Sequence, residues 1–105
     1  MREDAGFITT MREDVEVQSP ATMVAPNAGA RLRNRRQQLG LSIRDVHLSS
    51  TQIASELGNG HFVISVSRLS EIETRGAVPG IYRLHSLAAI YKVPLQELLS
   101  WYGVP

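Results

Sequence analysis

Residues 65–76 read SVSRLSEIETRG, a stretch that begins and ends with residue types found at helix ends. Ser65 is a residue type that caps the N-termini of helices, and Gly76 is the type that ends them. Between them, Leu69 and Ile72 are three positions apart, so both side chains lie on one face of a helix. The stretch therefore predicts a short helix that buries two apolar side chains and exposes most of its remaining surface.

Two helices are predicted before this stretch. Asn27 is of a type that caps helices, and the helix that it would open ends at Gly40. A second helix opens at Ser42, where an acidic residue three positions later completes a capping-box pattern, and it continues to Gly58. The hydroxyl-rich run Ser49-Ser50-Thr51 interrupts the apolar spacing, so a kink at this run is an alternative to a straight helix.

Two more helices are predicted after the stretch. Pro79-Gly80 starts the first of them, and Pro94 opens the last. Phe62-Val63-Ile64 fits either a short strand or an apolar linker. The apolar residues of the fourth helix recur at helical spacing: Ile81, Leu84, Leu87, Ala88 and Tyr91. The chain is therefore predicted to be all-α, with five helices and no convincing sheet.

Charge divides the 105 residues into two parts. Residues 1–27 hold two arginines against five acidic residues, a net charge of −3, and they lack sustained periodicity. Residues 28–105 hold nine basic against five acidic residues, a net charge of +4. We expect a disordered acidic N-terminal arm followed by one basic folded domain. This pattern is expected of nucleic-acid binders, although a charge of +4 is also ordinary for a soluble domain.

Three stretches carry a family resemblance: RQQLGLS at 36–42, LSEIE at 69–73 and LHSLAAIYKVPLQELL at 84–99, with Pro79 between the last two. Together they resemble the phage-repressor/Cro-like (XRE-type) helix-turn-helix family over residues 30–99 or so. The resemblance implies a lambda-repressor-like DNA-binding domain whose second and third helices form the DNA-reading motif. The third helix, near residues 65–75 here, would lie in the major groove, and the role implied is transcriptional regulation.

Five residues of this third helix are implied to face DNA: Ser65, Val66, Ser67, Arg68 and Glu71. Arg68 is a long donor suited to guanine or phosphate, and Val66 suits a thymine methyl group. The two serines are short donors for phosphates or bases, and Ser65 is equally well explained as an N-cap alone. Glu71 could accept from cytosine N4, although an acidic side chain facing DNA is more often repelled by phosphate.

The first helix carries three exposed-type arginines, Arg31, Arg33 and Arg35. They fit either a solvated helix face or electrostatic anchoring to DNA phosphates, and we expect at least one to anchor. The predicted DNA-binding set therefore includes Arg31 and Arg35, together with Arg44 at the start of the second helix.

The resemblance also implies an ion pair between Arg36 and Glu73 that ties the first helix to the third; this role is structural rather than base-reading. Two departures from the family pattern stand out. Ile43 occupies a position that is usually a phosphate-contacting glutamine. The chain from 42 to 69 is longer than the family pattern, so the second helix, the turn or both must be extended. The extra 58–64 loop could touch DNA or pack over the core.

Other function classes find little support in the sequence. The chain has no cysteine, which excludes disulfides and a thiol nucleophile. His47, His61 and His85 are scattered without carboxylates at metal-ligand spacing, so we expect no metal site. No nucleophile elbow or phosphate-binding glycine loop occurs, and we expect neither an enzyme nor a cofactor. No apolar run approaches the length of a membrane span, and a cytoplasmic protein without a small-molecule ligand is expected.

The expected partner is double-stranded DNA, with a homodimer as a further expectation. Trp101 and Tyr102 at the end of the last helix fit either a lid on the core or a dimer contact. The alternative function is a protein-interaction module, such as an antitoxin-like or adaptor protein. Steep loss of affinity with salt would distinguish DNA binding from an apolar protein interface.

Overall fold

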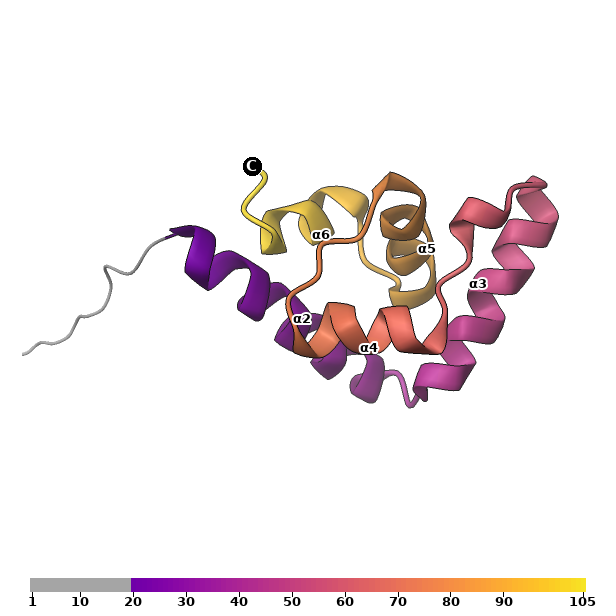
Figure 1. Ribbon diagram of the computed structural model, residues 1–105, viewed down its shortest axis with the longest axis horizontal. Coiled ribbons are helices and arrows are strands. Elements are labelled where there is room, and N and C mark those ends of the chain that lie inside the picture. The colour runs from indigo at the N-terminus through magenta and orange to yellow at the C-terminus, as the bar shows by residue number, and fades with distance from the viewer. Residues whose placement is uncertain (1–19) are drawn as a thin grey trace, which may run out of the picture.

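The computed structural model describes the chain from residue 20 to residue 105, with side chains described from residue 28. This part contains five α-helices, one 3₁₀ turn and no strand, which confirms the all-α prediction (Figure 1). The elements are α2 (Pro20–Gln38), α3 (Ile43–Leu57), the 3₁₀ turn η1 (Gly60–Phe62), α4 (Val66–Thr74), α5 (Ile81–Tyr91) and α6 (Leu95–Trp101).

The start of α2 differs from the prediction. The helix begins at Pro20, so Asn27 lies inside it and is not its N-cap. A proline fits the first helical position because its missing N–H would have no partner there in any case. Pro26 removes one further backbone hydrogen bond but does not end the helix. The last part of the predicted arm, 20–27, therefore belongs to α2, and the rest lies outside the described residues.

The beginning and end of α3 follow the sequence. Ser42 Oγ accepts a hydrogen bond from the Asp45 N–H at 3.0 Å, and the Asp45 carboxylate accepts one from the Ser42 N–H at 2.8 Å. This capping box confirms the prediction, and the bond from the Ser42 backbone lowers the pKa of Asp45. α3 runs without a break through the hydroxyl-rich run, and the Ser50 and Thr51 hydroxyls donate to carbonyl oxygens three residues earlier. Gly58 ends the helix with φ 66°, a left-handed conformation.

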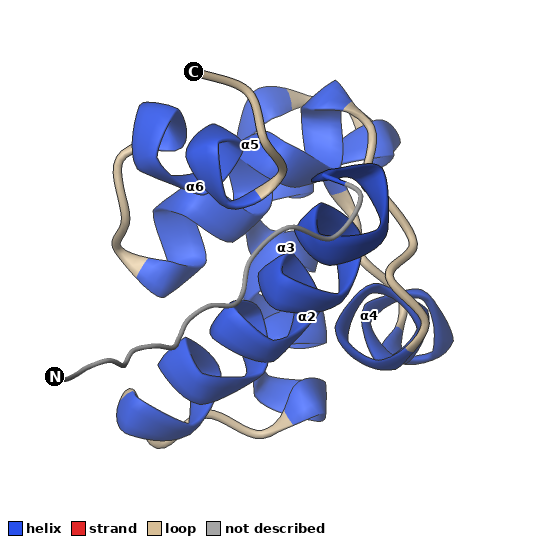
Figure 2. Ribbon diagram, turned by 90° about the vertical axis from the view of Figure 1, so that its left-hand side faces the viewer, coloured by secondary structure: helices blue, strands red, loops and turns tan. Residues whose placement is uncertain are grey.

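The five α-helices and the connection between α3 and α4 enclose one apolar core. Figure 2 views α4 end-on beside α2, with α5 and α6 above them. Burying each large apolar side chain contributes about 1.5–3 kcal/mol, so this cluster is the main source of stability. Its fully buried members are Leu32, Val46, Ile64, Leu69, Ile72, Leu87, Tyr91 and Leu98.

The connection between α3 and α4 packs on α5. The carbonyl oxygen of Phe62 accepts a hydrogen bond from the Ser86 hydroxyl at 2.7 Å, and that of Val63 accepts one from Arg83 Nε at 3.0 Å. The Phe62 ring meets the Tyr82 ring edge-on, with centroids 5.1 Å apart. The segment is therefore a linker rather than a strand. The extra 58–64 loop packs over the core, which is one of the two alternatives given for it above.

Candidate nucleic-acid interface

α4 has one buried and one exposed face. Leu69 and Ile72 are fully buried, and Glu73 is only 9% exposed. The residues predicted to face DNA on α4 and at its N-terminal end are exposed, except for Arg68, which is half-buried. We call this set the outer face of α4: Ser65, Val66, Ser67, Arg68 and Glu71.

The C-terminal end of α4 is bonded to α2 through Arg36 and Glu73. Arg36 Nε donates to Glu73 Oε2 at 2.7 Å, and Nη2 donates to Oε1 at 2.9 Å. Arg36 Nη1 also donates to the carbonyl oxygen of Leu41 at 3.0 Å, and the hydrogen bonds that Arg36 donates to Glu73 raise the Arg36 pKa. The ion pair implied by the resemblance is thus present, and its two-bond geometry fixes the angle between the helices.

The backbones of α2 and α4 also touch near this ion pair. A Cβ atom at Gly29 would lie 2.6 Å from the carbonyl oxygen of Glu73 and 2.8 Å from that of Ile72. Only glycine allows such an approach, since real Cβ atoms do not come this close to backbone oxygen. Gly29 therefore lets the C-terminal end of α4 lie directly against α2.

The N-terminal end of α4 is held by α3 through neutral groups. Ser50 Oγ accepts a hydrogen bond from the Ile64 N–H at 2.9 Å and donates one to the His47 carbonyl oxygen at 2.7 Å. His47 Nδ1 lies 2.9 Å from the Ile64 carbonyl oxygen, which can only accept, so Nδ1 carries the proton. Sequence reasoning missed both residues, although Ser50 is four positions after the buried Val46 and so on the same helix face.

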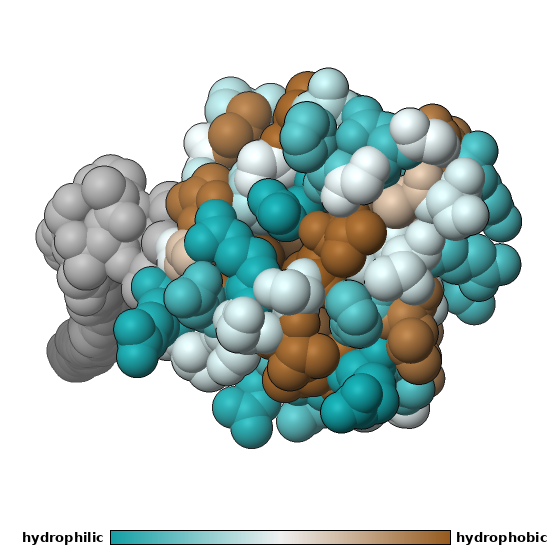
Figure 3. All heavy atoms as spheres, turned by 45° about the vertical axis from the view of Figure 1, so that its right-hand side comes forward, coloured by the Kyte–Doolittle hydropathy of each residue, from teal (hydrophilic) through white to brown (hydrophobic). Residues whose placement is uncertain are grey.

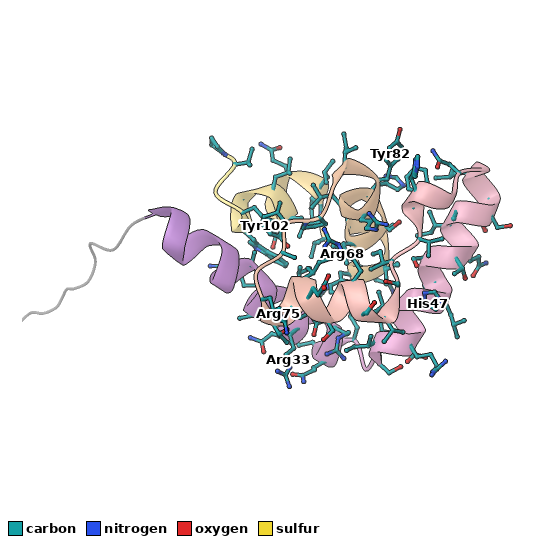
Figure 4. All side chains as sticks on the ribbon, viewed as in Figure 1. Arg33, His47, Arg68, Arg75, Tyr82 and Tyr102 are labelled. Carbon is teal, nitrogen blue, oxygen red and sulfur yellow. The ribbon has the colours of Figure 1, made fainter. Side chains whose placement is uncertain are left out.

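The outer face of α4 carries one surface ion pair. Arg68 Nη1 lies 3.3 Å from Glu71 Oε1, and the two side chains are 36% and 49% exposed. An exposed pair of this kind is worth little, so Arg68 can leave Glu71 for another acceptor at small cost. Ser65 Oγ accepts from the Arg68 N–H at 3.1 Å, which makes Ser65 the N-cap. Figure 4 shows Arg68 on α4 and His47 beside its N-terminal end.

The structure does not bring Arg31 and Arg35 to α4. The guanidinium carbon of Arg31 lies 5.9 Å from the ring centroid of Trp101 on α6. Arg35 Nε donates to the carbonyl oxygen of Tyr91 at 2.9 Å and so caps the end of α5. Both arginines lie on the side of α2 that faces α5 and α6. Arg44, in contrast, is exposed in the first turn of α3.

Two exposed arginines that the predicted DNA-binding set omits lie at the C-terminal end of α4. Arg75 is the C-cap of α4 itself. Arg33 on α2 lies between Gly29 and Arg36, which both contact that end of α4. Figure 4 shows Arg33 and Arg75 at the same end of the helix. The predicted set missed Arg33 because helical spacing does not say which side of α2 meets α4.

An apolar groove lies elsewhere, between α3 and α5. It measures about 420 Å³, and its apolar lining includes Leu39, Leu41, Ile53 and Ile90. Its walls also carry Gln52, Glu56 and Lys92. The groove is separate from the outer face of α4, none of whose residues lines it.

No known protein family, curated protein or solved structure matches the chain. From residue 20 onward, no helix has the length and apolar character needed to cross a membrane. The same part of the chain holds no cluster of three or more side chains suited to a metal ion.

Proposed function

We propose that this chain binds double-stranded DNA by placing the outer face of α4 in the major groove, and that it regulates transcription. One observation carries the proposal: α4 is fixed at both ends by buried hydrogen bonds while its outer face stays exposed. A DNA-reading helix needs this combination, because side chains distinguish base edges only from a fixed position. The major groove is about 12 Å wide and admits a single α-helix.

α3 and α4 would then act as the helix-turn-helix pair of a phage-repressor/Cro-like domain. Their connection over 58–65 is longer than the usual 3–4 residues, but Phe62 and Val63 are bonded to α5, and the outer face begins only at Ser65. Ile43 packs against the core and offers no donor to a phosphate. Arg44, exposed one position later, supplies a donor at that end of α3.

Three residues of the outer face have distinct proposed contacts with DNA. Arg68 exchanges Glu71 for a phosphate or for guanine O6 and N7, the acceptors that a guanidinium group fits best. Ser67 donates to a phosphate or a base, and Val66, which is 43% exposed, suits a thymine methyl group. Arg31 and Arg35 are left out of this surface, because both are engaged on the other side of α2.

The proposal is tested by fluorescence anisotropy with labelled random-sequence duplex DNA at several salt concentrations. Affinity should fall steeply as salt rises, because phosphate-bound counterions are released on binding. Arg68→Ala should weaken binding to a selected duplex by about tenfold to a hundredfold. The matched control is Lys92→Asn, which removes one positive charge from the α3–α5 groove and suits the left-handed conformation there, φ 56°. Absence of binding at low salt by the folded protein would contradict the proposal.

A protein-interaction module is the second candidate, favoured by the apolar groove between α3 and α5. Figure 3 brings the α3 side of the molecule forward and shows apolar patches separated by polar side chains. Leu48 and Leu57 on α3 are among the exposed apolar residues, at 55% and 54%. A protein bound through such a surface would hold its affinity as salt rises, unlike duplex DNA.

A further inference from the structure

We propose that Arg33 and Arg75 form a second DNA contact, which binds backbone phosphates beyond the C-terminal end of α4 regardless of base sequence. This inference rests on the proposed DNA binding and extends it from the outer face of α4 to a separate pair of residues on α2 and at the α4 C-cap. Its ligand is the phosphodiester group of duplex DNA.

The helix geometry of α2 places Arg33 toward α4. Successive residues turn by about 100° around a helix, so residues four and seven apart lie near one line. Gly29, Arg33 and Arg36 have this spacing. Gly29 approaches the α4 backbone, and Arg36 binds Glu73. Arg33 is therefore bracketed by two contacts to the C-terminal end of α4, whereas Arg31 points toward Trp101 on α6.

Arg33 and Arg75 also differ from the other arginines of α2 and α4 in what they bind; among the described residues, the exposed Arg44 on α3 likewise has no partner. Arg36 binds the buried carboxylate of Glu73, and Arg68 binds the exposed carboxylate of Glu71. Arg35 donates to a carbonyl oxygen at the end of α5. Arg33 and Arg75 are exposed and have no hydrogen-bond or ion-pair partner within the part of the chain that the structure describes. The Glu73 carboxylate at this end of α4 is already bound by Arg36, so the two free guanidinium groups favour an anion from outside the chain.

The dipole of α4 explains why positive side chains matter at this end. A helix C-terminus carries roughly half a negative charge, which repels phosphates that line the groove. Arg75 at the C-cap and Arg33 beside it place two positive charges over that end. They would offset the repulsion and allow α4 to lie along the groove between two phosphate backbones. Guanidinium groups suit this task because they bind phosphate oxygens with two parallel hydrogen bonds.

The test measures the slope of log Kd against log salt concentration for a random-sequence duplex. The variant is Arg33→Gln/Arg75→Gln, and its slope should be smaller than that of the unmodified protein by about 2, one for each phosphate that the variant no longer binds. Its affinity should fall by the same factor for random and selected duplexes. The matched control is Arg31→Gln/Lys92→Asn, which also removes two positive charges, one from the α6 side of α2 and one from the α3–α5 groove. This control should change the slope by less than half as much. Circular dichroism checks that both variants fold.

Two results would overturn the inference while leaving the proposed function intact. In the first, both double variants change the slope equally, so that only net charge matters. In the second, the Arg33/Arg75 variant keeps the original slope while Arg68→Ala still weakens binding. If the unmodified folded protein fails to bind DNA at low salt, the proposed function and this inference fall together.

Discussion

The two ends of α4 are attached to the rest of the molecule in different ways. At the C-terminal end, the charged groups of Arg36 and Glu73 meet in a nearly buried two-bond pair. At the N-terminal end, the neutral hydroxyl of Ser50 bridges α3 to the backbone of Ile64. Removing the partner of a buried charge lowers the free energy of unfolding far more than removing the partner of a buried neutral group. The difference predicts that the two ends respond unequally to mutation and to pH.

Removing the carboxylate at the charged end should have the largest effect. Glu73→Gln leaves the Arg36 guanidinium in a site that is only 9% exposed, without a compensating charge. We expect the free energy of unfolding to fall by about 3–5 kcal/mol, a large share of the 5–15 kcal/mol that holds typical domains together. Urea denaturation followed by circular dichroism measures this loss.

A double variant distinguishes the cost of an unpaired buried charge from the cost of losing the contact between Arg36 and Glu73. Arg36→Met/Glu73→Leu replaces both partners with apolar side chains, so no charge is left unpaired. We expect it to be more stable than Glu73→Gln, since apolar replacements of buried pairs are often neutral or stabilising. A double variant less stable than Glu73→Gln would contradict the view that the unpaired charge is the main cost.

Removing the hydroxyl at the neutral end should have a smaller effect. Ser50→Ala leaves the buried N–H of Ile64 without its acceptor, which costs about 1–3 kcal/mol. Thr51→Ala is the control, because the Thr51 hydroxyl bonds only to the Leu48 carbonyl oxygen within α3, and we expect it to cost about 0.5 kcal/mol or less. Equal losses in the two variants, measured by the same denaturation, would show that the bridge from α3 to α4 does not stabilise the fold.

High pH should destabilise the folded protein, with no effect at neutral pH. Burial, followed by the charge of Glu73, raises the Tyr91 pKa above its ordinary value of 10.0, and burial raises the pKa of Tyr102 to about 12. The folded protein therefore favours both neutral phenols. Their stabilisation is fully present below about pH 10 and is lost as pH rises toward and beyond 12.

Denaturation between neutral pH and pH 12 checks this prediction. The free energy of unfolding should decline above about pH 10, and Tyr102→Phe should make the decline shallower. The Tyr102 hydroxyl has no hydrogen-bond partner among the described residues, so this variant should cost little at neutral pH. A decline that is unchanged in Tyr102→Phe would mean that other groups cause it.

The sequence predicted the helices better than the contacts between them. Local signals, such as the capping box at Ser42 and the turn glycine at Gly58, determine helix ends within a few residues, and those predictions were confirmed. The predicted start of α2 was wrong, because a proline usually ends or kinks a helix, whereas α2 continues through Pro26. The Arg36–Glu73 pair came from a family resemblance, since spacing alone cannot pair two distant residues.

The arginines of α2 show most clearly where sequence reasoning ends. Helical spacing separates Arg31 and Arg35 from Arg33, but it does not say which side meets α4. A signal was present in Gly29, because a glycine inside a helix often marks a close approach of another backbone. Read in that way, it would have placed Arg33 rather than Arg31 beside the α4 helix.

The central claim, that the outer face of α4 contacts DNA, is tested most directly by NMR. Amide resonances of isotope-labelled protein are followed while short duplex DNA is added at low salt. The prediction is that the largest shifts fall between Ser65 and Glu71, with smaller ones at Arg33, Arg44 and Arg75. Shifts confined to the groove between α3 and α5, or no shifts at all, would contradict it.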